Sequence, residues 1–260
     1  MTKWVRFEHD DRIRIGRLEG DNIEIYRGNL FSSPVSVDDE IPLEAVQLLT
    51  PVSPKNFLGL WNNFRERASL EKLSEPEHPL YFTKTSNCLL ECGGSVKRPP
   101  GYSGSVAFEA ELGIVIGQRC HQVSELSAPD YIFGYTCVND LTAVDLLNTD
   151  PNFVQWTRAK SAPTFGAIGP VICTEFDPTD AAIQARVNGE VRQDFPVSDM
   201  FFSPNRIVSA ISHDMELYPG DVIACGTSIG SGELASGDVV DIVIDGIGVL
   251  SNTFAESESH

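Results

Sequence analysis

The amino-acid sequence predicts an α+β fold in which β-strands predominate. Short apolar runs recur along the 260-residue chain, and Gly, Pro, Asn and Asp residues separate them in the manner of turns between strands. Helical spacing of apolar residues is confined to a few short segments. A chain of this length with 42% hydrophobic residues can bury a substantial core. We therefore expect one large, mostly β body with a small appendage.

The first 50 residues are predicted to form that appendage, a small N-terminal β-subdomain. Residues 3–27 alternate as a meander of short strands. The proline-bearing segment 50–54 marks a boundary, so that the main domain would span residues 51–254. The polar residues 255–260 are predicted to form a flexible tail.

The remaining elements follow from local pattern. Short apolar runs predict strands at 56–60, 79–83, 106–117, 131–138 and 168–174, a hairpin about Asn188-Gly189, and turn-and-strand units at 219–225 and 236–242. Apolar residues at helical spacing predict short helices at 42–49, 141–147 and 204–213.

Composition narrows the classes of function. A formal net charge of −18 argues against binding nucleic acid or an anionic membrane through a basic face. No apolar run reaches about 18 residues, and the N-terminus lacks the apolar core of a signal peptide, so we expect a cytoplasmic protein without a membrane span. The six cysteines form no C-x-x-C pair, which argues against a zinc ribbon and favours buried, reduced thiols.

The strand predicted at 106–117 carries two acidic residues on one face. Because side chains alternate along a strand, Glu109 and Glu111 point the same way, with Cα atoms about 6.6 Å apart. If that face is covered, two like charges at this distance need a cation or a shared proton. Mg²⁺, Mn²⁺ and Ca²⁺ favour carboxylate ligands. The alternative is a solvated strand face that happens to be acidic.

Asp140 directly follows the strand predicted at 131–138. It stands where the N-cap of the helix predicted at 141–147 belongs, and capping alone would account for it. A strand end is also a suitable place for a metal ligand. The pattern leaves both readings open.

Two glycine-rich segments could line a pocket. Residues 93–104 precede the di-carboxylate strand and form either a lid or a surface connection. Residues 226–232 match neither the P-loop nor the dinucleotide-binding spacing, and their backbone N–H groups could face an anion.

Taken in order, several short motifs resemble the fumarylacetoacetate hydrolase family. The likeness extends from Phe57 to Phe254, about three quarters of the chain, and the series of motifs is more specific than any one of them. The matching segments are residues 59–64, 108–112, 134–140, 160–161, 168–170, 187–190, 217–221 and 226–227.

This resemblance implies a mixed β-roll body, a homodimer, and one Mg²⁺ or Mn²⁺ ion per site. The metal ligands would be Glu109, Glu111 and Asp140. The substrate would be a small 2-oxo acid that chelates the ion through a carboxylate oxygen and the 2-oxo oxygen. Lys160 is similar to the family lysine beside the metal, and an exposed loop lysine is the alternative. Thr227 and the adjacent backbone of Gly226 would anchor the substrate carboxylate.

One departure from the family pattern bears on the reaction. Family hydrolases place His and Glu at the positions that hold Arg65 and Ala68 here, and an arginine does not act as a general base at ordinary pH. Glu66 or Glu71 could substitute as the base. Arg65 could instead bind a second substrate carboxylate, or be a solvent-facing helix charge.

We therefore expect a metal-dependent enzyme that enolises a 2-oxo or 2-hydroxy-2-enoic acid, as an isomerase, tautomerase or decarboxylase. The second hypothesis is a hydrolase of C–C bonds in acylpyruvate- or fumarylpyruvate-type 2,4-dioxo acids. The third is a catalytically silent relative that keeps the metal site.

Overall fold

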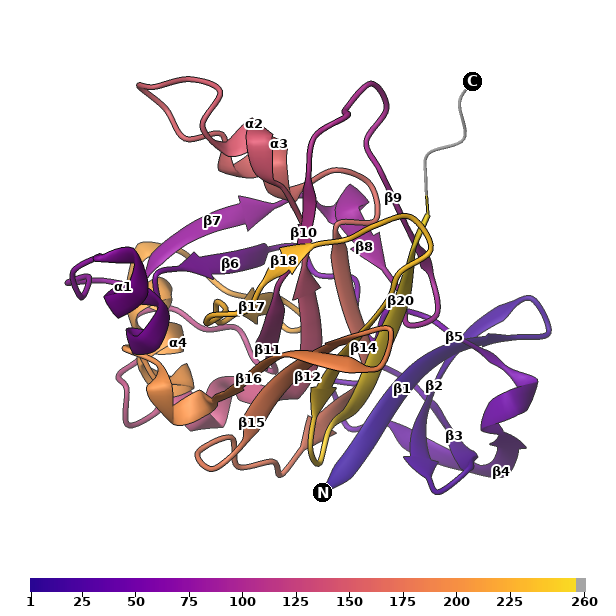
Figure 1. Cartoon of the computed structure of the whole chain (residues 1–260). Helices are drawn as coiled ribbons and strands as arrows, with labels where there is room; N and C mark the ends of the chain where they lie inside the picture. The colour runs from indigo at the N-terminus through magenta and orange to yellow at the C-terminus, as the bar shows by residue number, and fades with distance from the viewer. Residues whose placement is uncertain (256–260) are drawn as a thin grey trace.

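The computed structural model describes residues 1–255 and consists mainly of β-strands (Figure 1). The largest sheet runs, in spatial order, through β4 (Val35–Pro42), β3 (Asn22–Arg27), β2 (Arg12–Glu19), β1 (Thr2–His9), β14 (Gly166–Thr174), β12 (Ile132–Asp140), β11 (Ala110–Ile116), β17 (Val222–Ala224), β6 (Phe57–Trp61) and β7 (Leu80–Lys84). Two short strands join it, β5 (Gln47–Leu48) beside β1 and β8 (Leu89–Leu90) beside β14. The predicted mostly β, α+β fold is confirmed.

Two smaller sheets complete the strands of the described residues. One has the order β16 (Glu190–Pro196), β15 (Ala182–Val187), β19 (Val239–Ile244), β20 (Gly248–Ala255) and β9 (Ser95–Lys97). The other has the order β13 (Thr142–Ala143), β10 (Val106–Phe108) and β18 (Gly232–Glu233).

Helices are short and lie at the margins. They are α1 (Arg65–Glu71), α2 (Val144–Leu147), α3 (Trp156–Lys160) and α4 (Pro204–Asp214), with 3₁₀ turns η1 (Leu43–Ala45), η2 (Ser86–Cys88), η3 (Ala128–Tyr131) and η4 (Val197–Asp199). The predicted helix at 204–213 is confirmed as α4. It begins at Pro204, after Ser203, whose hydroxyl caps it by accepting from the N–H of Arg206. No helix among residues 1–255 is long and apolar enough to span a bilayer.

The predicted hairpin about Asn188-Gly189 is confirmed, and it connects β15 to β16. Both turn residues have positive φ, 53° for Asn188 and 82° for Gly189, as a tight two-residue hairpin turn requires. The prediction of a helix at 42–49 was wrong, because the structure has only the three-residue turn η1 there, followed by β5.

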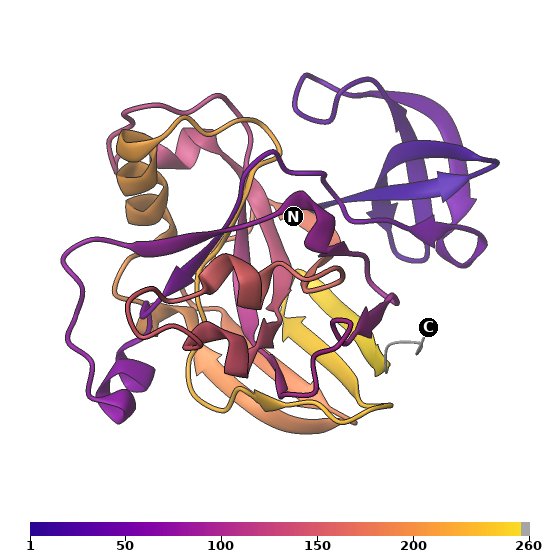
Figure 2. The same cartoon turned by 90° about the horizontal axis from the view of Figure 1, so that it is seen from above.

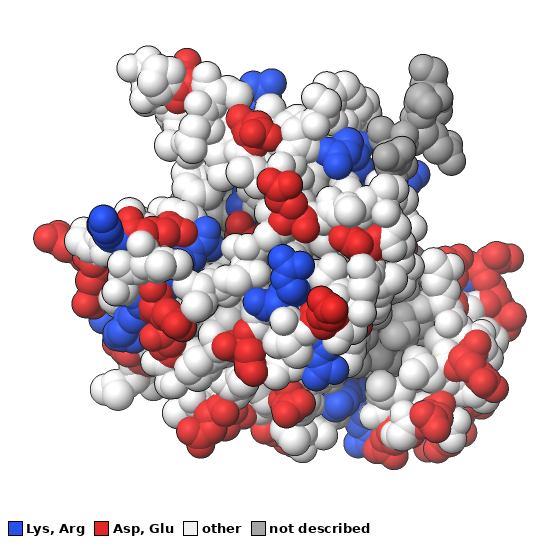
Figure 3. Space-filling model, viewed as in Figure 1, with Lys and Arg blue, Asp and Glu red and all other residues white. Residues whose placement is uncertain are grey.

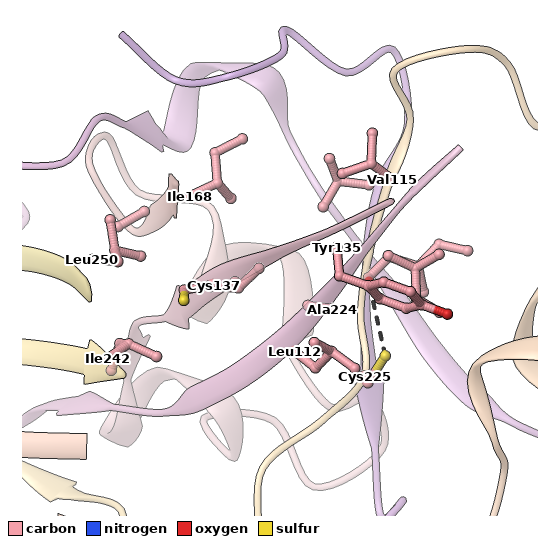
Figure 4. Close-up of a cluster of buried hydrophobic side chains, with 14 of the residues drawn as sticks. Leu112, Val115, Tyr135, Cys137, Ile168, Ala224, Cys225, Ile242 and Leu250 are labelled. Carbon is pink, nitrogen blue, oxygen red and sulfur yellow. Dashed lines mark hydrogen bonds between the residues drawn. The ribbon is translucent and has the colours of Figure 1, made fainter. Parts of the chain in front are cut away.

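The core lies between the five-stranded sheet and the middle of the large sheet. Strands β11, β12 and β14 contact β15, β19 and β20. Figure 4 shows Leu112 and Cys137 on one side of this core, with Ile242 and Leu250 opposite them. These four side chains are fully buried. Strands β11 and β12, which carry Glu111 and Asp140, therefore line this apolar core.

The N-terminal strands β2–β4 stand at one side of the body in both views (Figures 1 and 2). They are joined to it through β1, which pairs with β14 from Thr2↔Thr174 to Trp4↔Ile172. The division into domains at 1–50 and 51–254 stays a prediction. Ala255, the first residue of the predicted tail, is the last of β20, and residues 256–260 lie outside the described residues.

Candidate metal centre

Glu109 stands at a break between β10 and β11, so the prediction of one continuous strand over 106–117 was wrong at this residue. The break frees two main-chain N–H groups from the sheet ladder. The N–H of Glu109 donates to Oδ1 of Asn139 at 3.1 Å, and that of Ala110 donates to Oε1 of Gln193 at 2.9 Å. Side-chain amides thus replace ladder partners, because a buried N–H without an acceptor is costly.

The break brings three carboxylates together. One carboxylate oxygen from each of Glu109, Glu111 and Asp140 lies within 4.8 Å of the others. Glu111 and Asp140 are fully buried, and Glu109 is partly buried. The alternative of a solvated acidic strand face is therefore wrong.

Asp140 is the last residue of β12, and its own N–H donates to the carbonyl of Glu109 at 3.0 Å. The helix predicted at 141–147 begins only at Val144, and Ala143 occupies its N-cap position. The N-cap reading of Asp140 is therefore wrong, and its side chain is left for other partners.

Lys160, at the end of α3, reaches into this cluster. Its Nζ donates to Oε2 of Glu109 and to Oδ2 of Asp140, both at 2.8 Å. The residue is 1% exposed, which excludes the alternative of an exposed loop lysine. The segment 156–160 was not predicted to be helical, and its short helix turns Lys160 inward.

A second buried lysine, Lys84, was missed in the sequence. Its Nζ donates to Oδ1 of Asp140 at 2.5 Å and to the main-chain carbonyls of Lys160 and Phe165. Lys84 ends β7, and it shares the inward side of that strand with the buried Phe82. That inward position was the available signal, because a lysine there must be paired.

Burial and neighbouring charges shift the pKa values of these groups, in the same direction at Glu111 and in opposite directions at Asp140 and Lys160. Burial, followed by the charges of Asp140 and Glu109, raises the pKa of Glu111 well above its usual range. Burial acts the same way on Asp140, but Lys160 and Lys84 outweigh it and lower the pKa of this carboxyl. Burial would lower the pKa of Lys160, yet the facing carboxylates raise it.

The donor set fits a hard divalent cation. Oε2 of Glu111 accepts a 2.7 Å hydrogen bond from the N–H of Gly226, but its Oε1 is buried without a hydrogen-bond partner in the described part of the chain. An unpartnered, buried carboxylate oxygen beside two further carboxylates is the environment that Mg²⁺ or Mn²⁺ satisfies.

Gly226 and Thr227 contact the segment that carries two of these carboxylates, at Glu111 and Ala110 respectively. Gly226 has a φ of 88°, and a Cβ there would lie 3.3 Å from the carbonyl oxygen of Leu60. The hydroxyl of Thr227 donates to the carbonyl of Ala110 at 2.8 Å. The hydroxyl proton of Thr227 and the N–H of Gly226 are thus both committed within the protein, and the predicted role of these residues in binding the substrate stays a prediction.

Arg65 and Glu66 open α1 and contact none of the three carboxylates through a hydrogen bond or ion pair. The guanidinium of Arg65 donates to the carbonyls of Asp199 and Met200 and lies 5.0 Å from the ring centroid of Phe201. The N–H of Glu66 donates to Oδ2 of Asp199, and its carboxylate is exposed. Their predicted roles in substrate binding and proton transfer stay predictions.

Fold and site together define a class: a mostly β protein whose centre holds three clustered carboxylates. Two family descriptions match the sequence, the fumarylacetoacetate (FAA) hydrolase C-terminal domain over residues 55–255 and the Rv2993c-like N-terminal domain over residues 2–51. The chain belongs to the fumarylacetoacetate hydrolase family, as its motifs indicated. Its named relatives are isomerases, a tautomerase and hydrolases, and the chain is an enzyme of this family.

Three relatives illustrate the likeness. Oxaloacetate tautomerase YisK of Bacillus subtilis is 36% identical, over 90% of this chain and 83% of that protein. The structure of 2-hydroxyhepta-2,4-diene-1,7-dioate isomerase from Mycobacterium marinum has a TM-score of 0.91 at 33% identity and covers 100% of both chains. Fumarylacetoacetate hydrolase from Exiguobacterium antarcticum has a TM-score of 0.84 at 30% identity, covering 99% of this chain and 100% of that one.

Proposed function

We propose that the protein is a divalent-metal-dependent enzyme that enolises a small 2-oxo or 2-hydroxy-2-enoic acid, as a tautomerase, isomerase or decarboxylase. The observation that carries this proposal is the convergence of Glu109, Glu111 and Asp140 around an unpartnered oxygen, with Lys160 at 2.8 Å from two of them. These three carboxylates would hold Mg²⁺ or Mn²⁺. A bound ion supplies a Lewis acid for the 2-oxo oxygen.

Residues of the chain itself would supply charge stabilisation, proton transfer and substrate orientation. Lys160, whose Nζ lies 2.8 Å from Oε2 of Glu109, would stabilise the negative charge that develops on the substrate or transfer a proton. The loop that begins at Gly226 and Thr227 would orient the substrate carboxylate through main-chain N–H groups other than that of Gly226, which already donates to Glu111. Main-chain N–H groups in a turn favour anions. Both contributions rest on groups that are held in place before the substrate arrives.

Two residues of helix α1 favour enolisation over hydrolysis as the reaction. Arg65 and Ala68 occupy the positions of the water-activating His and Glu of family hydrolases, and no histidine among residues 1–255 hydrogen-bonds with the three carboxylates. The tautomerase and isomerase names of two relatives support the same choice. The name of a third, a hydrolase, keeps cleavage of acylpyruvate- or fumarylpyruvate-type acids as the second candidate, with Glu66 as the base.

Turnover assays separate these candidates. Oxaloacetate and an acylpyruvate are added with Mg²⁺ or Mn²⁺, and enol absorbance, CO₂ release and acid cleavage are followed. We expect enol–keto exchange or CO₂ release that stops on chelation and is absent in Glu109→Ala and Asp140→Ala. Cleavage of the acylpyruvate alone would support the hydrolase. Full activity in a chelated preparation would contradict the proposal, and metal binding without any turnover would indicate a silent relative.

The proposal extends to the compartment, the oligomeric state and the partners of the protein. We propose a cytoplasmic homodimer whose partner is the 2-oxo acid itself, rather than nucleic acid or a membrane. Acidic side chains are spread over the whole face shown in Figure 3, with basic ones among them, as a net charge of −18 implies. Such a surface gives an extended phosphate backbone little to bind.

A further inference from the structure

Gln193 is a buried amide at a position where the strand pattern calls for an apolar residue. In β16 the side chains of Arg192 and Asp194 are exposed, whereas Gln193 and Phe195 face inward. Gln193 is 1% exposed. A buried primary amide has two donor hydrogens and an acceptor oxygen that all need partners.

Those partners come from two segments of the candidate metal centre. Oε1 of Gln193 accepts from the N–H of Ala110, the residue between Glu109 and Glu111, at 2.9 Å. On the other side, Nε2 donates to Oγ1 of Thr227 at 2.9 Å. It also lies 3.2 and 3.1 Å from the carbonyls of Ser228 and Ile229. One side chain therefore connects the segment that carries Glu109 and Glu111 to the loop at residues 227–229.

A hydrogen bond from Thr227 to Ala110 completes this connection. The hydroxyl of Thr227 accepts from Gln193 and donates to the carbonyl of Ala110. Ala110 is thus held at both its N–H and its carbonyl, by Gln193 and by Thr227. Because Ala110 lies between two of the carboxylates, fixing its peptide groups fixes the directions in which Glu109 and Glu111 point.

The backbone around Gln193 is adapted to this contact. The pairing of β15 with β16 shifts between Ala185↔Gln193 and Arg186↔Val191, which leaves Arg192 as an extra residue on β16. This β-bulge pushes the carbonyl of Arg192 toward the loop, where a Cβ on Gly230 would lie only 2.2 Å from it. Bulges of this kind re-aim side chains near functional sites.

We propose that Gln193 is a positioning residue that sets the geometry of the metal ligands and of the substrate-anchoring loop together. This inference rests on the proposed function and adds a residue that touches neither metal nor substrate. The amide must be oriented with its oxygen toward Ala110, because the carbonyls of Ser228 and Ile229 accept only from a donor. A glutamate would keep the first contact and lose the second.

Two variants and a matched control test the proposal. Gln193→Met removes both contacts, and Gln193→Glu removes only the donors. The control is Asn252→Leu, because Asn252 is also 1% exposed, and its Nδ2 binds the carbonyls of Glu91 and Gly94, outside the candidate centre. The readouts are Mn²⁺ affinity of chelator-treated protein by calorimetry, kcat and KM for oxaloacetate, and thermal unfolding.

We expect Gln193→Met to weaken Mn²⁺ binding about 10- to 100-fold, the usual effect of losing a group that orients a ligand, and to raise KM. Gln193→Glu should raise KM but weaken Mn²⁺ binding less. Asn252→Leu should lower the unfolding temperature and leave the Mn²⁺ affinity and KM unchanged. If Gln193→Met does not fold, Thr227→Val interrupts the same connection and should change Mn²⁺ affinity in the same direction.

Wild-type Mn²⁺ affinity and KM in both Gln193 variants, with lowered unfolding temperatures like that of Asn252→Leu, would show a purely structural amide and overturn the inference. If the unmodified protein binds no Mn²⁺, the proposed function fails, and this inference fails with it. If the protein binds Mn²⁺ but turns over no 2-oxo acid, the affinities alone decide on Gln193.

Discussion

Glu111 accepts a hydrogen bond from the main-chain N–H of Gly226 at 2.7 Å through one oxygen, while its other oxygen is buried without a partner in the described chain. The hydrogen bond from Gly226 thus orients the Glu111 carboxylate, and the oxygen without a partner is Oε1. This pairing predicts opposite effects of a substitution at Glu111 with and without metal.

Glu111→Gln should abolish the stabilisation by Mn²⁺ without destabilising the metal-free protein. The raised pKa of Glu111 means that the folded metal-free protein keeps a proton that the unfolded chain releases above about pH 4.3, so its stability falls as pH rises. Glutamine removes this loss. Mn²⁺ at 100 times its Kd should stabilise the wild type by about 2.7 kcal/mol and the variant not at all.

Thermal unfolding between about pH 5 and pH 8 checks this expectation. As pH rises, the unfolding temperature of the metal-free variant should increase relative to that of the metal-free wild type. Equal stabilisation of both proteins by Mn²⁺ would mean that Glu111 is no ligand.

Lys84→Met should destabilise the fold strongly. Lys84 and Asp140 have side chains 0% and 1% exposed, and removing one member of a buried pair typically costs about 3–5 kcal/mol. Urea unfolding measures the change. Lys97→Met, at an exposed position, is the control and should stay within about 0.5 kcal/mol of the wild type. A small effect at Lys84 would show that Asp140 needs no cation there.

Lys160→Met should lower kcat by about 10²- to 10⁴-fold while leaving Mn²⁺ binding intact or tighter. The reason is that the ammonium group lies 2.8 Å from oxygens of both Glu109 and Asp140, where it would support the proposed substrate chemistry but repel a cation. Steady-state kinetics and Mn²⁺ calorimetry separate the two effects. Arg158→Met, an exposed change in the same helix, should alter neither. Loss of Mn²⁺ binding in Lys160→Met would assign the lysine a structural role instead.

Arg65→Met tests binding of a second substrate carboxylate. If Arg65 leaves its contacts with Asp199 and Met200 for the substrate, KM for oxaloacetate should rise about tenfold, as expected for one charged hydrogen bond, and KM for a monocarboxylate 2-oxo acid should not. Arg67→Met is the control in the same helix, since Arg67 pairs with Glu71. An unchanged KM for both acids would leave Arg65 as a helix charge.

The thiols should be nearly unreactive in the native state. All six cysteines are free, and only Cys92 is partly exposed. Burial raises the pKa of Cys225 and of Cys137, so neither forms the reactive thiolate at pH 8. We expect a thiol reagent at about pH 8 to modify at most Cys92 in the folded protein and all six after unfolding. Rapid native labelling that persists in Cys92→Ser would contradict this burial pattern.

Alternation, turn residues and one helical stripe were enough to predict most strands, the hairpin at Asn188 and helix α4. These patterns gave wrong predictions at single residues where a strand is interrupted or continues further than expected. The break at Glu109 leaves the alternation of 106–117 intact, because Asn139 and Gln193, distant in sequence, supply the missing hydrogen bonds. Asp140 looked like an N-cap because position alone does not show that a strand continues through it.

The candidate centre was predictable as a set of acidic residues but not as a balanced cluster. Glu109, Glu111 and Asp140 were found through spacing and motif order. Lys84 was missed because a lysine at a strand end is usually solvated, and its burial depends on carbonyls of Lys160 and Phe165, far along the chain.

The pairing of β1 with β14 has a practical consequence for truncation. Strand β14 lies between β1 and β12, the strand that ends in Asp140. Deleting residues 1–50 would leave part of β14 as a bare margin, open to strand addition from another molecule. A shortened protein should therefore self-associate. The disturbed strand β14 lies beside β12, so truncation would also affect the strand that carries Asp140.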